Sequence, residues 1–449
     1  MAERQALVGA LLIDGTGADP IEDAVLAVED GVIAYAGTKT AYSFVEGETV
    51  IDISGRTLMP GIIDCHCHLG GTSFPDEDNW VLEPDIYKAI ASVHQANAML
   101  QHGITSVRDI SVHGTHLRKA ITAGIVDGPR IVPCWRGLSR TGGHGDAAGV
   151  PAELVRTSHP WGIVADGVDE CRKITREIVK QGSRCIKIWA SGGGLHENEP
   201  EDAQHYSYEE LKAVVDEANL VHLPVCAHCE CASSALDAVK AGVWSIEHGE
   251  DLDEETIALM AERGVSLIPT LVLMVEWFEW SGEGGCYGDM YIPGGGDLPT
   301  DKQSLRVIHD RQLAGNLMAA KEAGIRIGLG SDTFCTGLTP YGQQSLNEVH
   351  CLVQAGLTKM EALVAATKSG AEILKIENVT GTLETGKAAD YIVLDVNPLE
   401  DISAIDVNNM VLIAKEGRPV RNPLSLLAAA ESDQPAPSQF WGMVLEKGV

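Results

Sequence analysis

Positively charged residues are scarce in this chain of 449 residues. Lysine and arginine number 33 against 64 aspartates and glutamates, which gives a formal net charge of −31 at pH 7. Such a chain repels the phosphates of nucleic acids and the headgroups of anionic membranes. We therefore expect neither nucleic acid nor a membrane as a partner.

The sequence has no long apolar run and, at its beginning, no basic segment followed by an apolar one. A membrane-spanning helix needs about 20 apolar residues, and a secretory signal needs the second pattern. The eleven cysteines do not form the paired Cys-x-x-Cys pattern of a zinc ribbon, and they stand in core-like segments such as Val225-Cys226-Ala227. These features predict buried free thiols and a cytoplasmic protein.

The distribution of apolar residues divides the chain into parts. Residues 1–59 carry short β-type runs, with a hairpin signal at Asp30-Gly31. From residue 60 to 375, short apolar strands alternate with amphipathic helices, as at 86–102, 209–219 and 254–263. Such alternation predicts an α/β protein with parallel strands and crossover helices, and a closed barrel of this kind carries catalytic groups at the carboxyl ends of its strands. The strands expected in this part are 104–108, 130–133, 185–190, 225–228, 245–247, 266–269 and 326–330.

The last part of the chain returns to β-type patterns. Residues 390–395 and 410–415 are predicted strands within the segment 376–425. The tail, 426–449, is expected to be less ordered. The glycine-containing stretch 276–300 is expected to form a long loop at the rim of the barrel.

Two histidines, His66 and His68, follow an apolar strand pattern at 58–64. On a strand, residues two apart point the same way, so the two imidazoles can bind one metal ion from one side. Taken alone, the pair is equally compatible with two polar residues at a strand end.

Lys187 lies inside the apolar strand predicted at 185–190. Burying an unpaired ammonium is costly, so burial favours the neutral, nucleophilic amine. Such an amine can add carbon dioxide and become a carbamate, an anion able to bridge two metal ions. The other interpretation is a lysine paired with a nearby carboxylate.

Three further metal-competent side chains, His228, His248 and Asp332, each end a separate predicted strand. Any one of them could be a capping or core polar group. Together, however, five strand ends deliver His-x-His, Lys, His, His and Asp in this order. Imidazole and carboxylate groups suit ions such as zinc, so the set predicts a site for two metal ions. Two ions can share a hydroxide, and Asp332 can take the proton of the attacking water and pass it to a leaving nitrogen.

With these residues assembled, the chain resembles the amidohydrolase superfamily over nearly its whole length. The run 60–68, PGIIDCHCH, is similar to the motif of the first barrel strand, Ser331-Asp332 to that of the eighth, and 381–395 to the return into the small β domain. The resemblance implies a (β/α)8 TIM barrel with a small β-sandwich domain formed by both chain ends. The implied parts are 1–59 and 376–425 for the β-sandwich, 60–375 for the barrel and 426–449 for the tail.

The resemblance also implies a role for each metal-competent residue. The six implied ligands are His66, His68, Lys187, His228, His248 and Asp332. The first two and Asp332 would hold the more buried ion, and the other two histidines would hold the second. Lys187, N6-carboxylated, would bridge two divalent ions, most often Zn2+. A homo-oligomer, with an octamer among its forms, is implied as well.

Two motifs, 139–146 and 187–194, make the chain similar to one branch: imidazolonepropionase-like amidohydrolases, Xaa-Pro and Xaa-Arg dipeptidases and ochratoxin-hydrolysing amidases. That branch cleaves the amide of N-acyl amino acids and dipeptides with a free carboxylate. His144 would then polarise the scissile carbonyl or bind substrate, unless it is a loop histidine bound to backbone, and Tyr206 would line the mouth. Many relatives carry a tyrosine two residues after the third histidine, whereas this chain has Glu230 there. Two interpretations of Glu230 are open: it contacts a cationic group, or it faces solvent.

The leading hypothesis is therefore a binuclear metal-dependent amidohydrolase that cleaves a small-molecule amide by metal-bound hydroxide, with Asp332 and His144 as catalytic residues. A mononuclear deaminase or cyclic amide hydrolase of the same superfamily is the alternative. Such enzymes usually lack the bridging lysine and carry a glutamate three residues after the third histidine, where this chain has Cys231. A scaffold protein that kept the fold would usually have lost metal ligands, and all six are present here.

Overall fold

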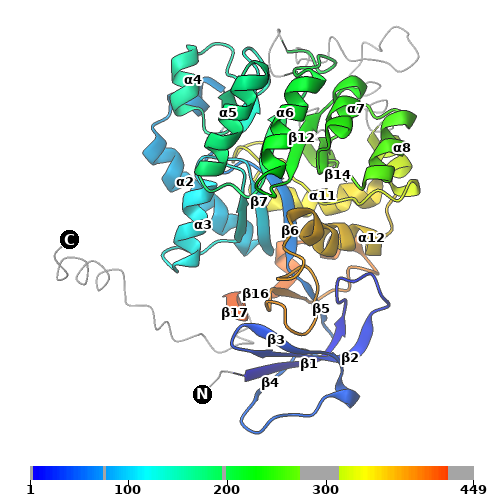
Figure 1. The fold of residues 1–449 in the computed structure, drawn as a ribbon. Helices are drawn as coiled ribbons and strands as arrows, with labels where there is room; N and C mark the ends of the chain where they lie inside the picture. Colours follow the sequence, from blue (N-terminus) through cyan, green and yellow to red (C-terminus); the bar gives the residue numbers. More distant parts are fainter. Residues whose placement is uncertain (1–3, 74–76, 195–198, 274–312, 423–449) are drawn as a thin grey trace, which may run out of the picture.

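A computed structural model of the chain, shown in Figure 1, describes residues 4–73, 77–194, 199–273 and 313–422. The predicted loop 276–300 and the predicted tail 426–449 lie outside the described residues. The described chain contains a mixed β-sheet built from both chain ends and a larger region of parallel strands with helices around them. None of the described helices is long and apolar enough to cross a membrane.

Strands from both chain ends pair in one eight-stranded sheet. They are β1 (Arg4–Leu12), β2 (Ile21–Glu29), β3 (Val32–Thr38), β4 (Thr49–Asp52), β5 (Thr57–Pro60), β15 (Tyr391–Leu394), β16 (Met410–Lys415) and β17 (Arg418–Arg421). The order is β17-β16-β15-β5-β1-β2-β3, with β4 beside β1. The predicted turn between β2 and β3 is confirmed: Asp30 and Gly31 have φ of +50° and +80°, as a tight hairpin turn requires.

Nine strands of the described ranges form two further sheets in which every pairing is parallel. They are β6 (Ile62–Cys67), β7 (Ile104–Asp109), β8 (Arg130–Pro133), β9 (Gly137–Ser139), β10 (Gly162–Val164), β11 (Ile186–Trp189), β12 (Val225–Cys229), β13 (Ser245–His248) and β14 (Ser266–Ile268). The first three form one sheet, and the others are ordered β10-β9-β11-β12-β13-β14. The sheets are linked, because the Arg184 amide donates to the Pro133 carbonyl (2.7 Å) and the segment 326–333 bonds to both β14 and β6.

The regular strand predicted at 326–330 is wrong. The segment runs alongside its neighbours, but within it only Ile327 forms a β-bridge, to Leu267. A Cβ on Gly330 would stand 2.4 Å from Ile268 Cγ2 and 2.9 Å from His66 Cβ. The backbone of this segment therefore approaches its neighbours too closely for a side chain, and regular pairing is replaced by single contacts.

Helices cover the outside of the parallel strands (Figure 1). In chain order they are α1 (Glu77–Leu82), α2 (Asp85–Gln101), α3 (Gly114–Thr122), α4 (Ala152–Ser158), α5 (Gly167–Lys180), α6 (Tyr208–Asn219), α7 (Ala232–Ala241), α8 (Glu254–Arg263), α11 (Gln343–Gln354), α12 (Lys359–Val364) and α13 (Gly370–Leu374). The helices predicted at 86–102, 209–219 and 254–263 are confirmed to within a residue at each end. Ser207 and Glu210 form a capping box at the start of α6, which is the local signal that begins the helix there.

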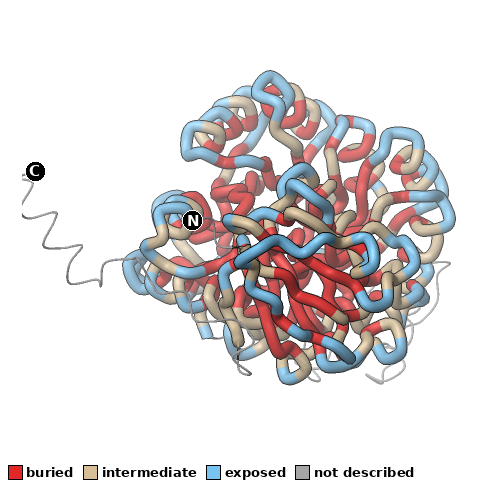
Figure 2. Tube along the Cα trace, turned by 90° about the horizontal axis from the view of Figure 1, so that it is seen from below, coloured by how far each residue is buried: buried red, intermediate tan, exposed pale blue. Residues whose placement is uncertain are grey.

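The core lies between these helices and the strands, and Figure 2 shows buried residues concentrated in the interior with exposed residues around them. Ile186 and Ile188 of β11 belong to the same apolar cluster as Val214 and Ala218 of α6. Alternate residues of a strand point to opposite faces. The side chain of Lys187 therefore points away from the helices, into the space between the strands, where the strand ends build a pocket.

Candidate active site

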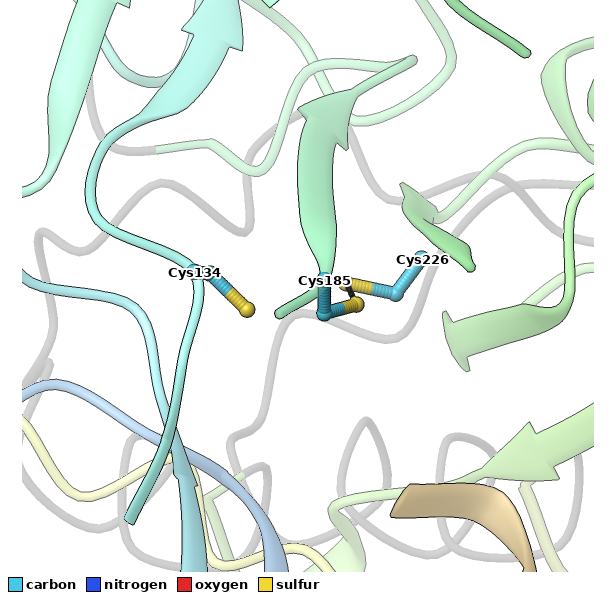
Figure 3. A group of neighbouring side chains, drawn as sticks. All are labelled: Cys134, Cys185 and Cys226. Carbon is cyan, nitrogen blue, oxygen red and sulfur yellow. Dashed lines mark hydrogen bonds between the residues drawn. The ribbon is translucent and has the colours of Figure 1, made fainter. Parts of the chain in front are cut away.

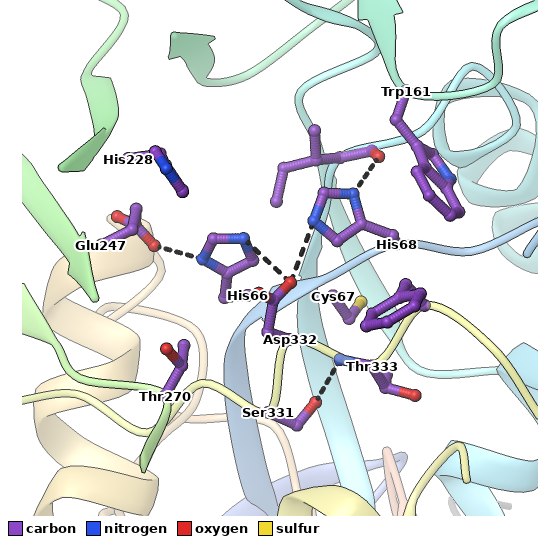
Figure 4. A network of polar contacts seen from close by, with 12 residues as sticks. His66, Cys67, His68, Trp161, His228, Glu247, Thr270, Ser331, Asp332 and Thr333 are labelled. Atoms are coloured by element: carbon purple, nitrogen blue, oxygen red, sulfur yellow. Dashed lines mark hydrogen bonds and ion pairs between the residues drawn. The ribbon is translucent and has the colours of Figure 1, made fainter. Parts of the chain in front are cut away.

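The carboxyl ends of the parallel strands bring five of the six predicted ligands to the lining of one pocket, with Lys187 buried behind them; Figure 4 shows His66, His68, His228 and Asp332. His66 lies in β6, His228 in β12 and His248 at the end of β13, and all three line the pocket together with His68 and Asp332. Residues separated by more than 260 positions in the chain thus face one another. This is the arrangement expected when each strand contributes one group at its end.

Two of these residues have backbone conformations that are uncommon for side-chain-bearing residues. His248 has φ of +67° and Asp332 has φ of +47°. The chain turns sharply at the end of β13 and again after the segment 326–330, and both side chains line the pocket. Such positive-φ positions cluster at functional sites, where surrounding structure holds them in place.

His66, His68 and Asp332 form a compact group on one side of the pocket. Oδ1 of Asp332 lies 3.1 Å from Nε2 of His68 and 3.4 Å from Nε2 of His66. All three residues are buried. Two imidazole nitrogens and a carboxylate oxygen converging at this spacing are suited to hold a divalent cation.

His228, Glu230 and His248 form a second group whose ligand atoms also lie within 4.8 Å of one another. The rings of His228 and His248 are 4.6 Å apart, between centroids. Nε2 of His248 is 4.0 Å from Oδ2 of Asp332, so the carboxylate of Asp332 connects the two groups. The pocket therefore offers two adjacent places for a cation.

The four histidines share a pattern of hydrogen bonding in which one ring nitrogen meets a protein acceptor. Nδ1 of His66 contacts Glu247 Oε2 (2.7 Å), and Nδ1 of His68 contacts the carbonyl of Ile110 (3.1 Å). The remaining two contacts are Nδ1 of His248 with Thr270 Oγ1 (2.6 Å) and Nε2 of His228 with the carbonyl of Gly192 (2.9 Å). This leaves one nitrogen of each ring for the pocket, which is the pattern that metal-binding histidines show.

The electrostatic surroundings keep the imidazoles neutral. Burial lowers the pKa of His66 and of His228 well below the ordinary value, and the charge of Lys187 acts in the same direction on His66. Burial also lowers the pKa of His248 to about 4. A neutral imidazole is the form that can give a lone pair to a metal ion, so the site fits a cation by its chemistry as well as by its spacing.

Carboxylates crowd the same pocket. Glu230, Glu201 and Glu250 line it. Burial raises the pKa of Glu230 well above its usual range, and the charges of Glu250 and Glu201 act in the same direction. Glu230 thus faces the pocket rather than solvent, and the crowding favours a positively charged neighbour.

Lys187 is fully buried beside the first group. Its Nζ lies 3.2 Å from Nε2 of His66 and 5.4 Å from the ring centroid of Trp189. Within the part of the chain that the structure describes, it forms no ion pair with a carboxylate. The alternative interpretation, a lysine paired with a nearby carboxylate, predicted such a pair.

Two residues that sequence reasoning missed hold this arrangement from behind. Glu247 is fully buried and accepts hydrogen bonds from His66 and from the Nη2 of Arg108. It occupies the position before His248 in β13, and Arg108 lies in β7. Charged residues inside two predicted strands were a signal in the sequence. Glu247, however, meets His66 across 181 residues and Arg108 across 139, so no local pattern shows these contacts.

His144 also faces the pocket and stacks on His228, with ring centroids 4.6 Å apart and planes at 21°. Its Nδ1 lies 3.1 Å from Oε2 of Glu199, a fully buried carboxylate that also accepts a hydrogen bond from the Gly193 amide. Glu199 was not among the predicted residues.

The expectation that Tyr206 lines the mouth is wrong: its ring is buried in the core around α6, and its hydroxyl donates to the carbonyl of Ala165 (2.9 Å).

The remaining wall of the pocket is apolar and largely aromatic. It is formed by Trp80, Trp161, Trp189, Leu273 and Phe334. The rings of Trp80 and Trp161 are in contact, with centroids 4.5 Å apart. The cavity therefore combines a polar floor with a wall suited to an apolar group of a ligand.

The chain is similar in sequence and in structure to known proteins. The sequence model of the amidohydrolase family matches residues 57–420. Ochratoxinase from Aspergillus niger is 31% identical over 443 residues, which cover 93% of this chain and 86% of that protein. The crystal structure of A. niger ochratoxinase has a TM-score of 0.82 at 28% identity, covering 94% of this chain and 96% of that chain. A prolidase crystallised with N-methylphosphonate-L-proline has a TM-score of 0.80 at 30% identity, covering 93% and 100%.

Proposed function

The chain belongs to the amidohydrolase family, and we propose that it is a binuclear metal-dependent enzyme that cleaves the amide bond of N-acyl amino acids or dipeptides. Its relatives make it a hydrolase acting on amide bonds. The single observation that carries the finer proposal is the pair of ligand groups in one pocket, with Lys187 buried beside them.

The two ligand groups support a division of labour among the residues. His66, His68 and Asp332 would hold the more buried ion, and His228 and His248 would hold the second. Imidazole and carboxylate donors favour zinc among the common divalent ions. Bound there, the pair of cations supplies the charge that polarises a carbonyl and promotes the ionisation of water.

Lys187 is proposed to bridge the ions as an N6-carboxylated lysine. Its amine is buried without a carboxylate partner in the described ranges, and it lies 3.2 Å from a nitrogen of His66. A buried ammonium next to a cation site would be repelled by the cation. Addition of carbon dioxide to the neutral amine, with one proton released to solvent, would replace that positive charge with an anionic carbamate able to serve both ligand groups.

Asp332 is proposed to move the proton. One of its oxygens contacts His68 and His66, and the other points toward His248. The carboxylate therefore stands between the two groups, where it can accept a proton from the attacking water and hand it to the departing nitrogen. Without that proton the amine would have to leave as an anion.

His144 is proposed to contact the carbonyl oxygen of the substrate. Its Nδ1–H is held by Glu199, so its Nε2 is the atom presented to the pocket. The buried carboxylate of Glu199 can balance the charge of a protonated ring, in which Nε2 donates a hydrogen bond. Such a donor strengthens as negative charge develops on the oxygen.

The substrate class rests on the pocket and on the named relatives. The aromatic wall, with Trp161 and Trp189, suits an apolar acyl group or side chain. The solved relatives include an ochratoxinase and a prolidase with a proline derivative bound. A small amide with a free carboxylate on its amino-acid part is the substrate that we infer.

The architecture proposed with this function is a closed (β/α)8 barrel with a small β-sandwich domain. The links between β8 and the start of β11, and from β14 through 326–333 to β6, support the closure. The proposed parts are 1–59 and 376–425 for the β-sandwich, 60–375 for the barrel and 426–449 for the tail. We propose a homo-oligomer, with an octamer as one candidate form.

The test combines metal analysis with a substrate panel. The full chain, purified and supplied with zinc and bicarbonate, should hold about two zinc ions per chain and hydrolyse members of a panel of N-acyl amino acids and dipeptides. Removal of the metal by a chelator should abolish the hydrolysis, and zinc should restore it. About one ion per chain together with deaminase activity would support the alternative hypothesis of a mononuclear enzyme. Failure to hydrolyse any member of the panel would contradict the proposal.

Replacing Glu247 by glutamine tests how the first ligand group is held. Glu247→Gln keeps the size of the side chain but removes the charge that orients His66 and pairs with Arg108. We expect zinc affinity, measured by competition with a chromophoric chelator, to fall about 10- to 100-fold. Glu217→Gln is the matched control, because Glu217 on α6 pairs with Arg176 of α5 and neither residue lines the pocket. Equal affinities for both variants would contradict the role of Glu247.

A further inference from the structure

Three cysteines from neighbouring strands meet in the interior of the molecule (Figure 3). Cys134 follows β8, Cys185 precedes β11 and Cys226 lies in β12. The three sulfurs lie within 4.8 Å of one another, and the sulfurs of Cys185 and Cys226 are 3.5 Å apart. All three residues are at most 1% exposed. None of them has a part in the proposed hydrolysis.

This cysteine cluster is distinct from the pocket but lies next to it. Residues two apart on a strand point to the same side, so Cys185 shares its side with Lys187, and Cys226 with His228. Cys226 is also the register partner of Lys187 between β11 and β12. The cluster therefore occupies the layer of side chains beneath the proposed metal ligands, and its residues do not line the pocket.

A buried positive charge accompanies the sulfurs. The guanidinium of Arg108 is at most 1% exposed, and its Nε has no hydrogen-bond partner within the described part of the chain. Its Nη2 pairs with Glu247, and the Nε–H group, which lacks a partner there, is available to donate to a thiolate.

We propose that Cys134, Cys185 and Cys226 form a separate thiolate site for a soft monovalent metal ion, copper(I). Thiolates select soft ions, and structural zinc sites need four ligands, whereas the described residues supply three sulfurs. Around an ion about 2.3 Å from each of three sulfurs, trigonal geometry places the sulfurs about 4 Å apart, within the observed spacing. Binding breaks S–H bonds and forms Cu–S bonds, the protons pass to solvent, and no oxidation state changes.

The experiment uses the reduced full chain with its zinc sites filled, loaded with copper by two routes. One route is expression in copper-supplemented cells, and the other is anaerobic titration with copper(I) in acetonitrile. After exposure to a competing copper(I) chelator, we expect about one copper per chain, with X-ray absorption showing sulfur ligands only. Zinc content should stay unchanged. No retained copper by either route, or copper bound through nitrogen, would overturn the proposal.

A matched pair of variants localises the ion. Cys185→Ser should weaken copper retention at least about 100-fold. Cys171→Ser, which changes a buried thiol on α5 instead, should retain copper like the wild type. Loss in both variants, or in neither, would overturn the assignment. If Cys185→Ser does not fold, Cys134→Ser replaces it, because it removes another sulfur of the same cluster. It should lose copper to the same degree, and copper retention like that of the wild type would overturn the proposal.

Discussion

Lys187→Ala is expected to lose one of two bound ions and to lower kcat/KM by about 1,000-fold or more, since bridging by an anion stabilises charge by several kcal/mol. The side chain is fully buried, and its Nζ lies 3.2 Å from a nitrogen of His66. The substitution would remove the proposed carbamate and leave a cavity where the lysine side chain lies. Metal content by mass spectrometry and hydrolysis of the best panel substrate measure the two effects.

A small carboxylic acid should partly reverse both effects in Lys187→Ala. Acetate or propionate can enter the cavity and offer two oxygens where the carbamate stood, so we expect metal content and activity to rise with its concentration. Lys187→Arg is the control, because it keeps a positive charge, fills the cavity and cannot be carboxylated at neutral pH. If Lys187→Arg kept two ions and near-normal activity, the bridging role of Lys187 would be excluded.

The sequence made the inward-facing residues of the strands predictable, because their signal is local. His66 lies in β6 and His68 directly follows it, two residues on, while His248 is the last residue of β13. Spacing and position therefore indicated a common side and a common end. The structure places these side chains in one pocket. Spacing along the strand was enough for this, because the strand geometry fixes the direction of every second side chain.

The supporting contacts could not be predicted in the same way, because they join distant parts of the chain. Glu247 contacts His66 and Arg108 only after three strands have come together. Glu199 reaches His144 across 55 residues. The position of Glu247 inside a strand indicates burial, but no local pattern around Glu247 or Glu199 identifies the histidine that each carboxylate contacts.

Tertiary packing accounts for the errors. The strand predicted at 326–330 looks regular in its apolar pattern, but Gly330 lies against Ile268 at a distance that excludes a Cβ. Tyr206 precedes a polar helix start, which suggested exposure, yet its ring is buried in the core around α6. In both cases tertiary packing overrode what the neighbouring residues indicated.

Asp332→Asn is expected to separate metal binding from proton transfer. Asparagine keeps the size of the side chain and one oxygen toward His66 and His68, so about two ions per chain should remain. It cannot accept a proton at working pH, so kcat for an amide should fall by about 100- to 10,000-fold with little change in KM. Metal analysis and steady-state kinetics on one preparation give both quantities.

Comparing substrates with different leaving groups tests whether the loss of kcat in Asp332→Asn comes from the missing proton transfer. An amide must expel an amine, which needs that proton, whereas an ester of the same acyl group expels an alcohol or phenol that needs it far less. Asp332→Asn should therefore lose much more activity on the amide than on an activated ester. The oxygen nearest His248, 4.0 Å away, lies toward the second group of ligands, where the departing nitrogen would stand. If activity on the amide and on the ester fell equally while both metal ions remained bound, Asp332 would position other groups of the site without transferring the proton. His144 would then be the residue to test for proton transfer.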